Sequence, residues 1–186
     1  MKPAVRGLLA LLLIAGTSLA QALELPQLQQ LLRSGARPDA RYEEVRESPW
    51  LSSPVTTRGT LHVTRQGLEK RIESPGPETW RLLQDRLEWQ GADGARRQIP
   101  FTQAPALQAL ADVTRRAVAG DLAGLERDFR ITVRGHADVW SARLEPRSAA
   151  LQRQLDSVEL QGTGGQLRVL IVTERQGERT TTRILP

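Results

Sequence analysis

Hydrophobic and polar residues alternate along most of this chain, in short segments separated by turn-forming residues. Alternation with a period of two buries one face of a strand, so these segments are predicted to be β-strands. The first group of strands covers residues 41–47, 57–65, 68–73, 80–83 and 86–89. The second group covers residues 130–133, 139–144, 155–161, 166–173 and 179–185. Short turns between neighbouring segments indicate antiparallel pairing within each group.

Helical spacing of apolar residues appears before and between these two groups. The first helix is indicated by leucines that end at a glycine, a common helix stop. These residues are Leu25, Leu28, Leu31, Leu32 and Gly35. A second helix is predicted at residues 105–119, with Leu107 and Leu110 on one face, and Asp121 is predicted to cap a short third helix. This order of elements predicts an α+β fold in which short helices lie across a strongly curved sheet.

The first 22 residues have the three-part pattern of a secretory signal peptide. Lys2 and Arg6 precede an apolar run at residues 8–15, and Ala20-Gln21-Ala22 forms a small-residue cleavage site. The run is far shorter than the roughly 20 residues of a membrane-spanning helix. We therefore expect residues 1–22 to be removed on export, leaving residues 23–186 as a single soluble domain in the periplasm. No cysteine follows the run, so the acceptor for a lipoprotein anchor is missing.

The composition argues against several functional classes. Residues 23–186 carry 24 Lys and Arg against 21 Asp and Glu, a net charge of +3, and the two signs are interspersed. No continuous basic strip for nucleic acid is therefore expected. Two histidines without metal-like spacing, no cysteine and no Gly-x-Ser-x-Gly motif indicate a protein that is not an enzyme and has neither metal nor cofactor. Glu43, Glu44 and Glu47 are interpreted as a solvated strand face.

Two sets of residues do not fit a plain core. Alternation in residues 60–65 places Leu61, Val63 and Arg65 on one face, so an apolar face ends in a guanidinium. Arg65 is either a solvated residue at a strand end or a cavity-rim residue that bonds to the carbonyls of a covering helix. The tryptophans divide in the same way, between filling a core and lining an apolar cavity. They are Trp50, Trp80, Trp89 and Trp140.

Residues 59–70, Gly-Thr-Leu-His-Val-Thr-Arg-Gln-Gly-Leu-Glu-Lys, resemble the glycine, strand, arginine and next-strand segment of the LolA-type outer-membrane lipoprotein carriers. Residues 40–47, residues 140–146 and the segment that begins at residue 155 resemble other parts of the family in the same order. The resemblance covers nearly all of residues 23–186. It rests on the order and spacing of these segments. Residues 107–129 resemble a divergent LolA-related branch, part of which is linked with export of aryl-polyene or other acylated products.

The resemblance implies an incomplete antiparallel β-barrel lidded by helices. Its apolar cavity would shelter the acyl chains of a lipoprotein or related lipid, received from an inner-membrane transporter and passed to an outer-membrane acceptor by a monomer. Arg65 stands at the position of the family's lid-contacting arginine. Gln66 replaces the usual proline, and Leu68-Glu69-Lys70 lacks the usual aromatic pair. The candidate cavity and lid residues are Arg65, Leu61, Val63, Leu68, Trp80, Leu82, Trp89, Leu107, Leu110 and Trp140.

A closed interaction module is the alternative to a carrier. It would be a non-catalytic adaptor of an envelope lipid or aryl-polyene export system, with the same fold, a filled core and no internal ligand. Leucine-lined helix faces are compatible with both functions, because they form a core in a closed protein and a lid in an open one.

The first prediction concerns Arg65→Leu. If the guanidinium holds a lid shut until a ligand displaces it, the substitution removes the closed-state hydrogen bonds and favours the ligand-bound state. We expect tighter retention of an acyl ligand, or impaired release, measured as the rate of ligand transfer to acceptor vesicles. Unchanged transfer would remove the reason for assigning a special role to this arginine.

Overall fold

The computed structural model describes residues 22–122 and 124–186. The expected signal peptide lies outside the described residues except for Ala22. The helices are α1 (Leu25–Gly35), α2 (Pro105–Val118) and α3 (Ala149–Gln152), with 3-10 turns η1 (Phe101–Gln103) and η2 (Leu125–Arg127). The strands are β1 (Asp39–Glu47), β2 (Val55–Val63), β3 (Leu68–Ser74), β4 (Glu78–Leu82), β5 (Arg86–Gln90), β6 (Arg96–Pro100), β7 (Phe129–Gly135), β8 (Trp140–Pro146), β9 (Leu155–Thr163), β10 (Gln166–Glu174) and β11 (Arg179–Ile184).

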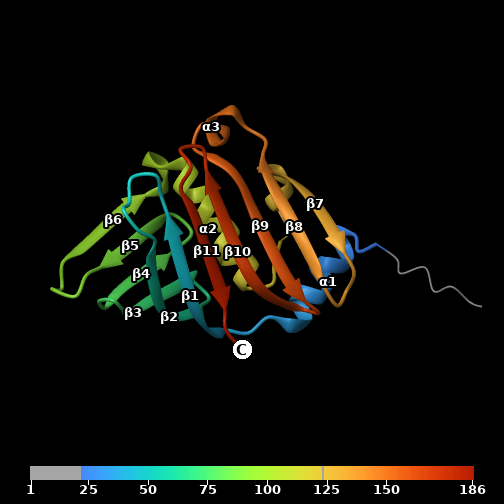
Figure 1. Cartoon of the computed structure of the whole chain (residues 1–186), viewed down its shortest axis with the longest axis horizontal. Coiled ribbons are helices and arrows are strands. Elements are labelled where there is room, and N and C mark those ends of the chain that lie inside the picture. The colour runs from blue at the N-terminus through green and yellow to red at the C-terminus, as the bar shows by residue number, and fades with distance from the viewer. Residues whose placement is uncertain (1–21, 123) are drawn as a thin grey trace, which may run out of the picture.

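The strands form one antiparallel sheet with the order β6-β5-β4-β3-β2-β1-β11-β10-β9-β8-β7. The two groups of strands join through β1 and β11, where Tyr42 lies opposite Ile184. The sheet is strongly curved and does not close, and α2 lies against its inner face (Figure 1). This confirms the α+β class and the incomplete barrel with short covering helices that the sequence predicted.

The apolar faces of α1 and α2 cover different parts of the sheet. Leu28 and Leu32 of α1 are almost completely buried in the main core, together with Val113 of α2. Strands β8 and β9 supply the centre of this core, where Leu144 and Leu160 have no exposed surface. Proline in the first turn of each helix is compatible with its start, because the first backbone N–H groups have no partner within the helix. The part of the sheet formed by β8 and β9 is thus closely packed.

Several local expectations were wrong. Strand β2 ends at Val63, so Arg65 lies in the turn that precedes β3. The short third helix capped by Asp121 is instead the 3-10 turn η2, which follows Gly124 at a left-handed φ of 81°. Strand β6 and helix α3 were not predicted. The sequence of β6, Arg-Arg-Gln-Ile-Pro, lacks apolar alternation because all five of its residues are exposed.

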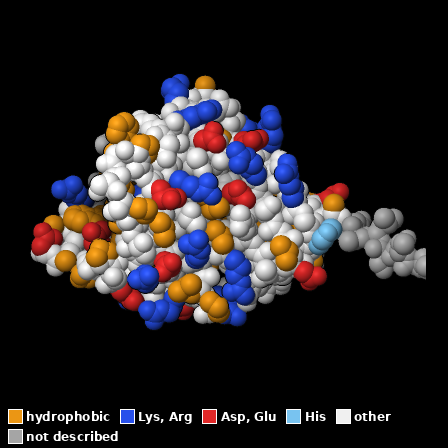
Figure 2. Space-filling model, viewed as in Figure 1, with side chains coloured by type: hydrophobic (Ala, Val, Ile, Leu, Met, Phe, Trp, Pro, Cys, Tyr) orange, Lys and Arg blue, Asp and Glu red, His pale blue; other side chains and the backbone are white. Residues whose placement is uncertain are grey.

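Strands β6 and β7 are the two edges of the sheet. Both carry exposed arginines, which are Arg96 and Arg97 on β6 and Arg130 and Arg134 on β7. On the outer face of the sheet, cationic and anionic side chains are mixed rather than separated (Figure 2). In residues 22–122 and 124–186, no helix has the length and apolar character needed to span a membrane.

The end of α1 lies against the turn between β9 and β10 with no space for a side chain. A Cβ atom at Gly165 would lie 2.3 Å from the Leu31 carbonyl oxygen and 3.0 Å from the Gly35 Cα. Such distances force one of the two backbones to move. Glycine at this position therefore fixes how closely α1 approaches the sheet.

The second prediction is that Gly165→Ala destabilises the fold by about 1–3 kcal/mol, as overpacking does elsewhere. The measurement is the free energy of unfolding in urea. Gly76→Ala is the matched control, because a Cβ at Gly76 would meet no atom within 4 Å, and we expect little change there. Equal effects of the two substitutions would contradict the close approach as the cause.

Candidate functional site

An apolar cavity of about 310 Å³ lies between α2 and the inner face of the sheet. Ligand pockets in proteins usually measure roughly 300 to 1,000 Å³, so this cavity is at the small end of the range. Its lining is mostly aliphatic, with a few polar side chains on the strands. The lining residues are Glu44, Leu61, Leu68, Lys70, Trp80, Leu82, Leu87, Leu107, Leu110, Ala111, Thr114, Val118, Leu170, Val172, Glu174, Thr180, Thr182 and Ile184.

Helix α2 supplies one wall of the cavity. Leu107, Leu110, Ala111, Thr114 and Val118 line it, and their spacing places them along a single helix face. The Thr114 hydroxyl donates to the Leu110 carbonyl oxygen at 2.9 Å, which satisfies it within the helix. The face that α2 presents to the cavity is therefore almost entirely apolar.

The opposite wall comes from strands in both halves of the sheet. Leu68 lies opposite Leu82 in the β3–β4 pairing, and Leu61 lies opposite Lys70 in the β2–β3 pairing. Cross-strand neighbours share a face of a sheet, so these side chains all face inward. Strands β10 and β11 complete the wall with Leu170 and Thr182, among others. The cavity thus spans the junction between the two halves.

A charged pair lies in this mostly apolar wall. Lys70 Nζ contacts Glu44 Oε1 at 2.6 Å, and the two side chains are only 20% and 19% exposed. The Thr182 hydroxyl donates to the other Glu44 oxygen at 2.7 Å, and Lys70 Nζ lies 5.0 Å from the centre of the Tyr42 ring. A charge removed from water needs such partners to be tolerated. Burial raises the pKa of Tyr42, and the charge of Glu44 raises it further.

Six of the ten predicted site residues line the cavity. They are Leu61, Leu68, Trp80, Leu82, Leu107 and Leu110. Val63 packs beside the cavity, in the cluster formed by Tyr42, Leu61 and Leu68.

The other three predicted residues lie away from the cavity wall. Trp89 lies opposite Trp80 in the β4–β5 pairing, with ring centres 6.3 Å apart. Trp140 belongs to the main core, where its indole N–H donates to the Gly164 carbonyl oxygen at 2.8 Å. Arg65 is exposed in the turn between β2 and β3 and has no hydrogen bond or ion pair with any described residue. The expected contact between Arg65 and a helical lid is therefore not made in this structure, and the closed-state hydrogen bonds on which the Arg65→Leu prediction rests are not present in it.

Trp50 and Glu44 occupy environments that the sequence analysis did not anticipate. Trp50 is 77% exposed in a loop, so it neither fills a core nor lines a cavity. Glu44 was assigned to a solvated face with Glu43, yet alternation along β1 places the two on opposite faces and Glu44 on the inner one. Its alternation with the buried Tyr42 was the signal that could have identified it.

The two histidines lie outside the apolar cavity. His62 is exposed on the outer face and contacts Asp39, and His136 is exposed in the turn between β7 and β8. Within the described part of the chain, no group of three or more histidine or carboxylate side chains is placed to hold a metal ion.

An open, curved antiparallel sheet with an apolar cavity under a helix defines a fold with room for a small apolar ligand. The family described as outer membrane lipoprotein carrier protein LolA-like matches residues 17–185. The chain belongs to this LolA-like family.

Solved structures similar to the chain have low sequence identity. A LolA superfamily protein from Nitrosomonas europaea is 9% identical with a TM-score of 0.47, over 89% of this chain and 93% of that chain. A candidate outer membrane lipoprotein-sorting protein domain from Vibrio parahaemolyticus is 10% identical with a TM-score of 0.42, over 86% and 89%. A DUF1329 family protein from Desulfovibrio piger is 10% identical with a TM-score of 0.42, over 86% and 88%. A search of curated proteins returns no match.

The third prediction concerns Glu174 in the cavity wall. Burial raises the pKa of this carboxyl and Glu178 raises it further, against the opposing effect of Arg46. A carboxyl whose pKa is raised by folding lowers the free energy of unfolding when it is ionised. Below the unfolded-state pKa of about 4.3 the carboxyl is protonated in both states, so this destabilisation disappears. We expect Glu174→Gln to increase the free energy of unfolding at neutral pH and to lose this advantage in acid.

The test of Glu174→Gln is urea unfolding near pH 7 and again at acid pH. Glu126→Gln is the control, because Glu126 is an exposed residue of the turn η2. A gain that persists unchanged in acid would show that ionisation is not its cause.

Proposed function

We propose that the protein is a periplasmic carrier that shelters an acyl chain of a lipoprotein or related lipid between α2 and the inner face of the sheet. The observation that carries the proposal is the apolar cavity of about 310 Å³, whose helical wall consists of Leu107, Leu110 and their neighbours. Membership of the LolA-like family supports the same function. The carrier would receive its cargo from an inner-membrane transporter and deliver it to an outer-membrane acceptor.

The energetics of acyl chains give such a carrier a clear use. Each methylene exposed to water costs about 0.8 kcal/mol, so a chain of ordinary length does not cross an aqueous compartment unaided. Delivery also requires release. A cavity at the small end of the usual range must enlarge to hold a long chain, and separating α2 from the sheet consumes part of the binding free energy.

The cavity volume also bears on the amount of cargo. In its present state it has room for part of one acyl chain, and several chains would require α2 to move away from β3 and β4. Gly120 and Gly124, which follow α2, have left-handed φ values of 69° and 81°. Helix α2 is therefore the proposed lid.

The fourth prediction is that Leu110→Trp blocks the cavity. The larger side chain occupies the space between α2 and the strands, so we expect uptake of a fluorescent fatty-acid analogue to fall by about tenfold or more. Gln108→Trp is the matched control, because Gln108 is an exposed residue of the same helix. It should bind the analogue normally.

Extraction of the natively purified protein for lipid mass spectrometry complements this test. Bound acyl lipid in the wild type and its loss in Leu110→Trp would support the carrier. A wild-type protein that is empty and takes up no analogue would favour the non-catalytic adaptor, whose core holds no ligand.

A further inference from the structure

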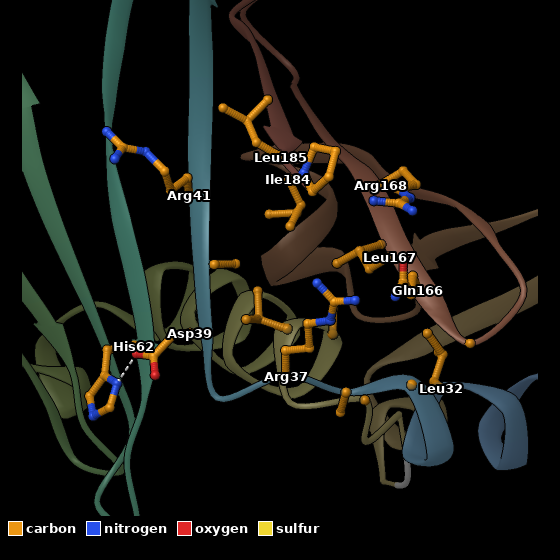
Figure 3. A pocket seen from close by; sticks show the side chains of 18 of the residues that line it. Leu32, Arg37, Asp39, Arg41, His62, Gln166, Leu167, Arg168, Ile184 and Leu185 are labelled. Carbon is orange, nitrogen blue, oxygen red and sulfur yellow. Dashed lines mark hydrogen bonds and ion pairs between the residues drawn. The ribbon is translucent and has the colours of Figure 1, made fainter.

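A second hollow, of about 510 Å³, lies where the ends of β1, β10 and β11 meet the C-terminal ends of α1 and α2. Its floor is apolar and includes Leu32 and Leu167 (Figure 3). Val118 and Ile184 line both this hollow and the apolar cavity. A ligand that occupied one could therefore extend toward the other.

The charges around this second hollow are mostly positive. Among the described residues that line it, four are arginines and one, Asp39, has a carboxylate side chain. Arg41 pairs with Glu73 on β3, and Arg71 pairs with Glu69, which it shares with Arg81. The Asp39 carboxylate contacts the His62 ring.

The remaining two cations are Arg37 and Arg168, which form no ion pair within the described part of the chain. Arg37 lies in the connection between α1 and β1, and Arg168 lies at a register shift in β10. Such a bulge redirects a side chain relative to the regular alternation. Arg168 Nε donates only to the Thr163 hydroxyl, at 3.3 Å. Both guanidinium groups lie on the side of β1 that faces β10, whereas Arg41 and His62 lie on the other side (Figure 3).

The ends of the two helices oppose these charges only in part. A helix C-terminus carries roughly half a negative charge, which favours nearby cations. Two such ends balance about one of the two unpaired guanidinium groups. Side chains and helix ends together therefore leave an excess of positive charge beside the apolar lining residues, and the terminal carboxylate of Pro186, which also lines the hollow, opposes part of it.

We propose that this hollow binds the anionic group, a phosphate or carboxylate, of an amphiphilic cargo whose hydrocarbon chain enters the apolar cavity. Arg37 and Arg168 are the binding residues, since guanidinium groups form strong charge-assisted hydrogen bonds to such oxygens. The inference rests on the proposed carrier function and adds to it the chemical class of the cargo and its orientation.

Charge in the apolar cavity favours the same orientation. There Glu44 and Glu174 face a single cation, Lys70, so an anionic group is disfavoured among them. The arginine-lined hollow is the end at which a negative group gains rather than loses electrostatic free energy.

The test compares binding of dodecyl phosphate, dodecanol and inorganic phosphate to the wild type by calorimetry. We expect dodecyl phosphate to bind about tenfold more tightly than dodecanol, as a charge-assisted contact allows. Inorganic phosphate should bind far more weakly than either. Arg37→Gln with Arg168→Gln should remove the preference and leave dodecanol affinity unchanged. The control double variant, Arg130→Gln with Arg153→Gln, removes the same number of positive charges outside the hollow. It should retain the preference for dodecyl phosphate.

The outcomes separate the two proposals. If neither amphiphile binds, the carrier function itself fails. If the wild type binds dodecyl phosphate and dodecanol equally well, the headgroup site alone is overturned. The same holds if both double variants lose affinity for dodecyl phosphate to the same extent. Tight binding of inorganic phosphate would overturn the assignment to an amphiphile.

Salt provides a measurement that does not depend on how the variants fold. Raising the ionic strength should weaken the wild type's binding of dodecyl phosphate while sparing dodecanol, because charged contacts near the surface are screened. Insensitivity to salt would contradict the role of the two arginines.

Discussion

The structure depends on covering one large apolar surface, the inner face of an open eleven-stranded sheet. A sheet that does not close cannot bury this face against itself, so the helices must do so. On strands β8 and β9 the covering is complete, and Leu144, Val158 and Leu160 have no exposed surface. Between α2 and strands such as β2, β3 and β4, the covering is incomplete and leaves a cavity of about 310 Å³. The cavity therefore lies where the helices do not completely fill the concave side of the sheet.

The charged pair in the cavity limits how apolar that space is. Lys70 and Glu44 satisfy each other, and Thr182 satisfies the second carboxylate oxygen. Such a pair adds little stability in itself, but removal of one partner leaves a costly charge. The cavity wall thus combines aliphatic surface with fixed charges, and a proposed acyl ligand would meet both.

Much of the architecture could be predicted from the sequence because period-two alternation determines which side of each strand is buried. Alternation identified most strands and the inward-facing Leu61, whereas helical spacing identified Leu107 and Leu110. Sequence could not locate β6, which is paired through its backbone and has no buried side chain. Nor could it place Arg65 or Trp140, because the end of a strand and the division between filled core and cavity depend on tertiary packing. Arg168 required a bulge that no local pattern indicates.

The arginines on the outermost strands have a consequence for self-association. An open sheet has two unpaired edges, and each is a template on which another strand can add. Arg96 and Arg97 on one edge, and Arg130 and Arg134 on the other, would bring like charges together if two copies joined edge to edge. Pro100 removes one backbone donor from β6 as well. The architecture that leaves room for a ligand thus carries its own protection against fibril-like growth.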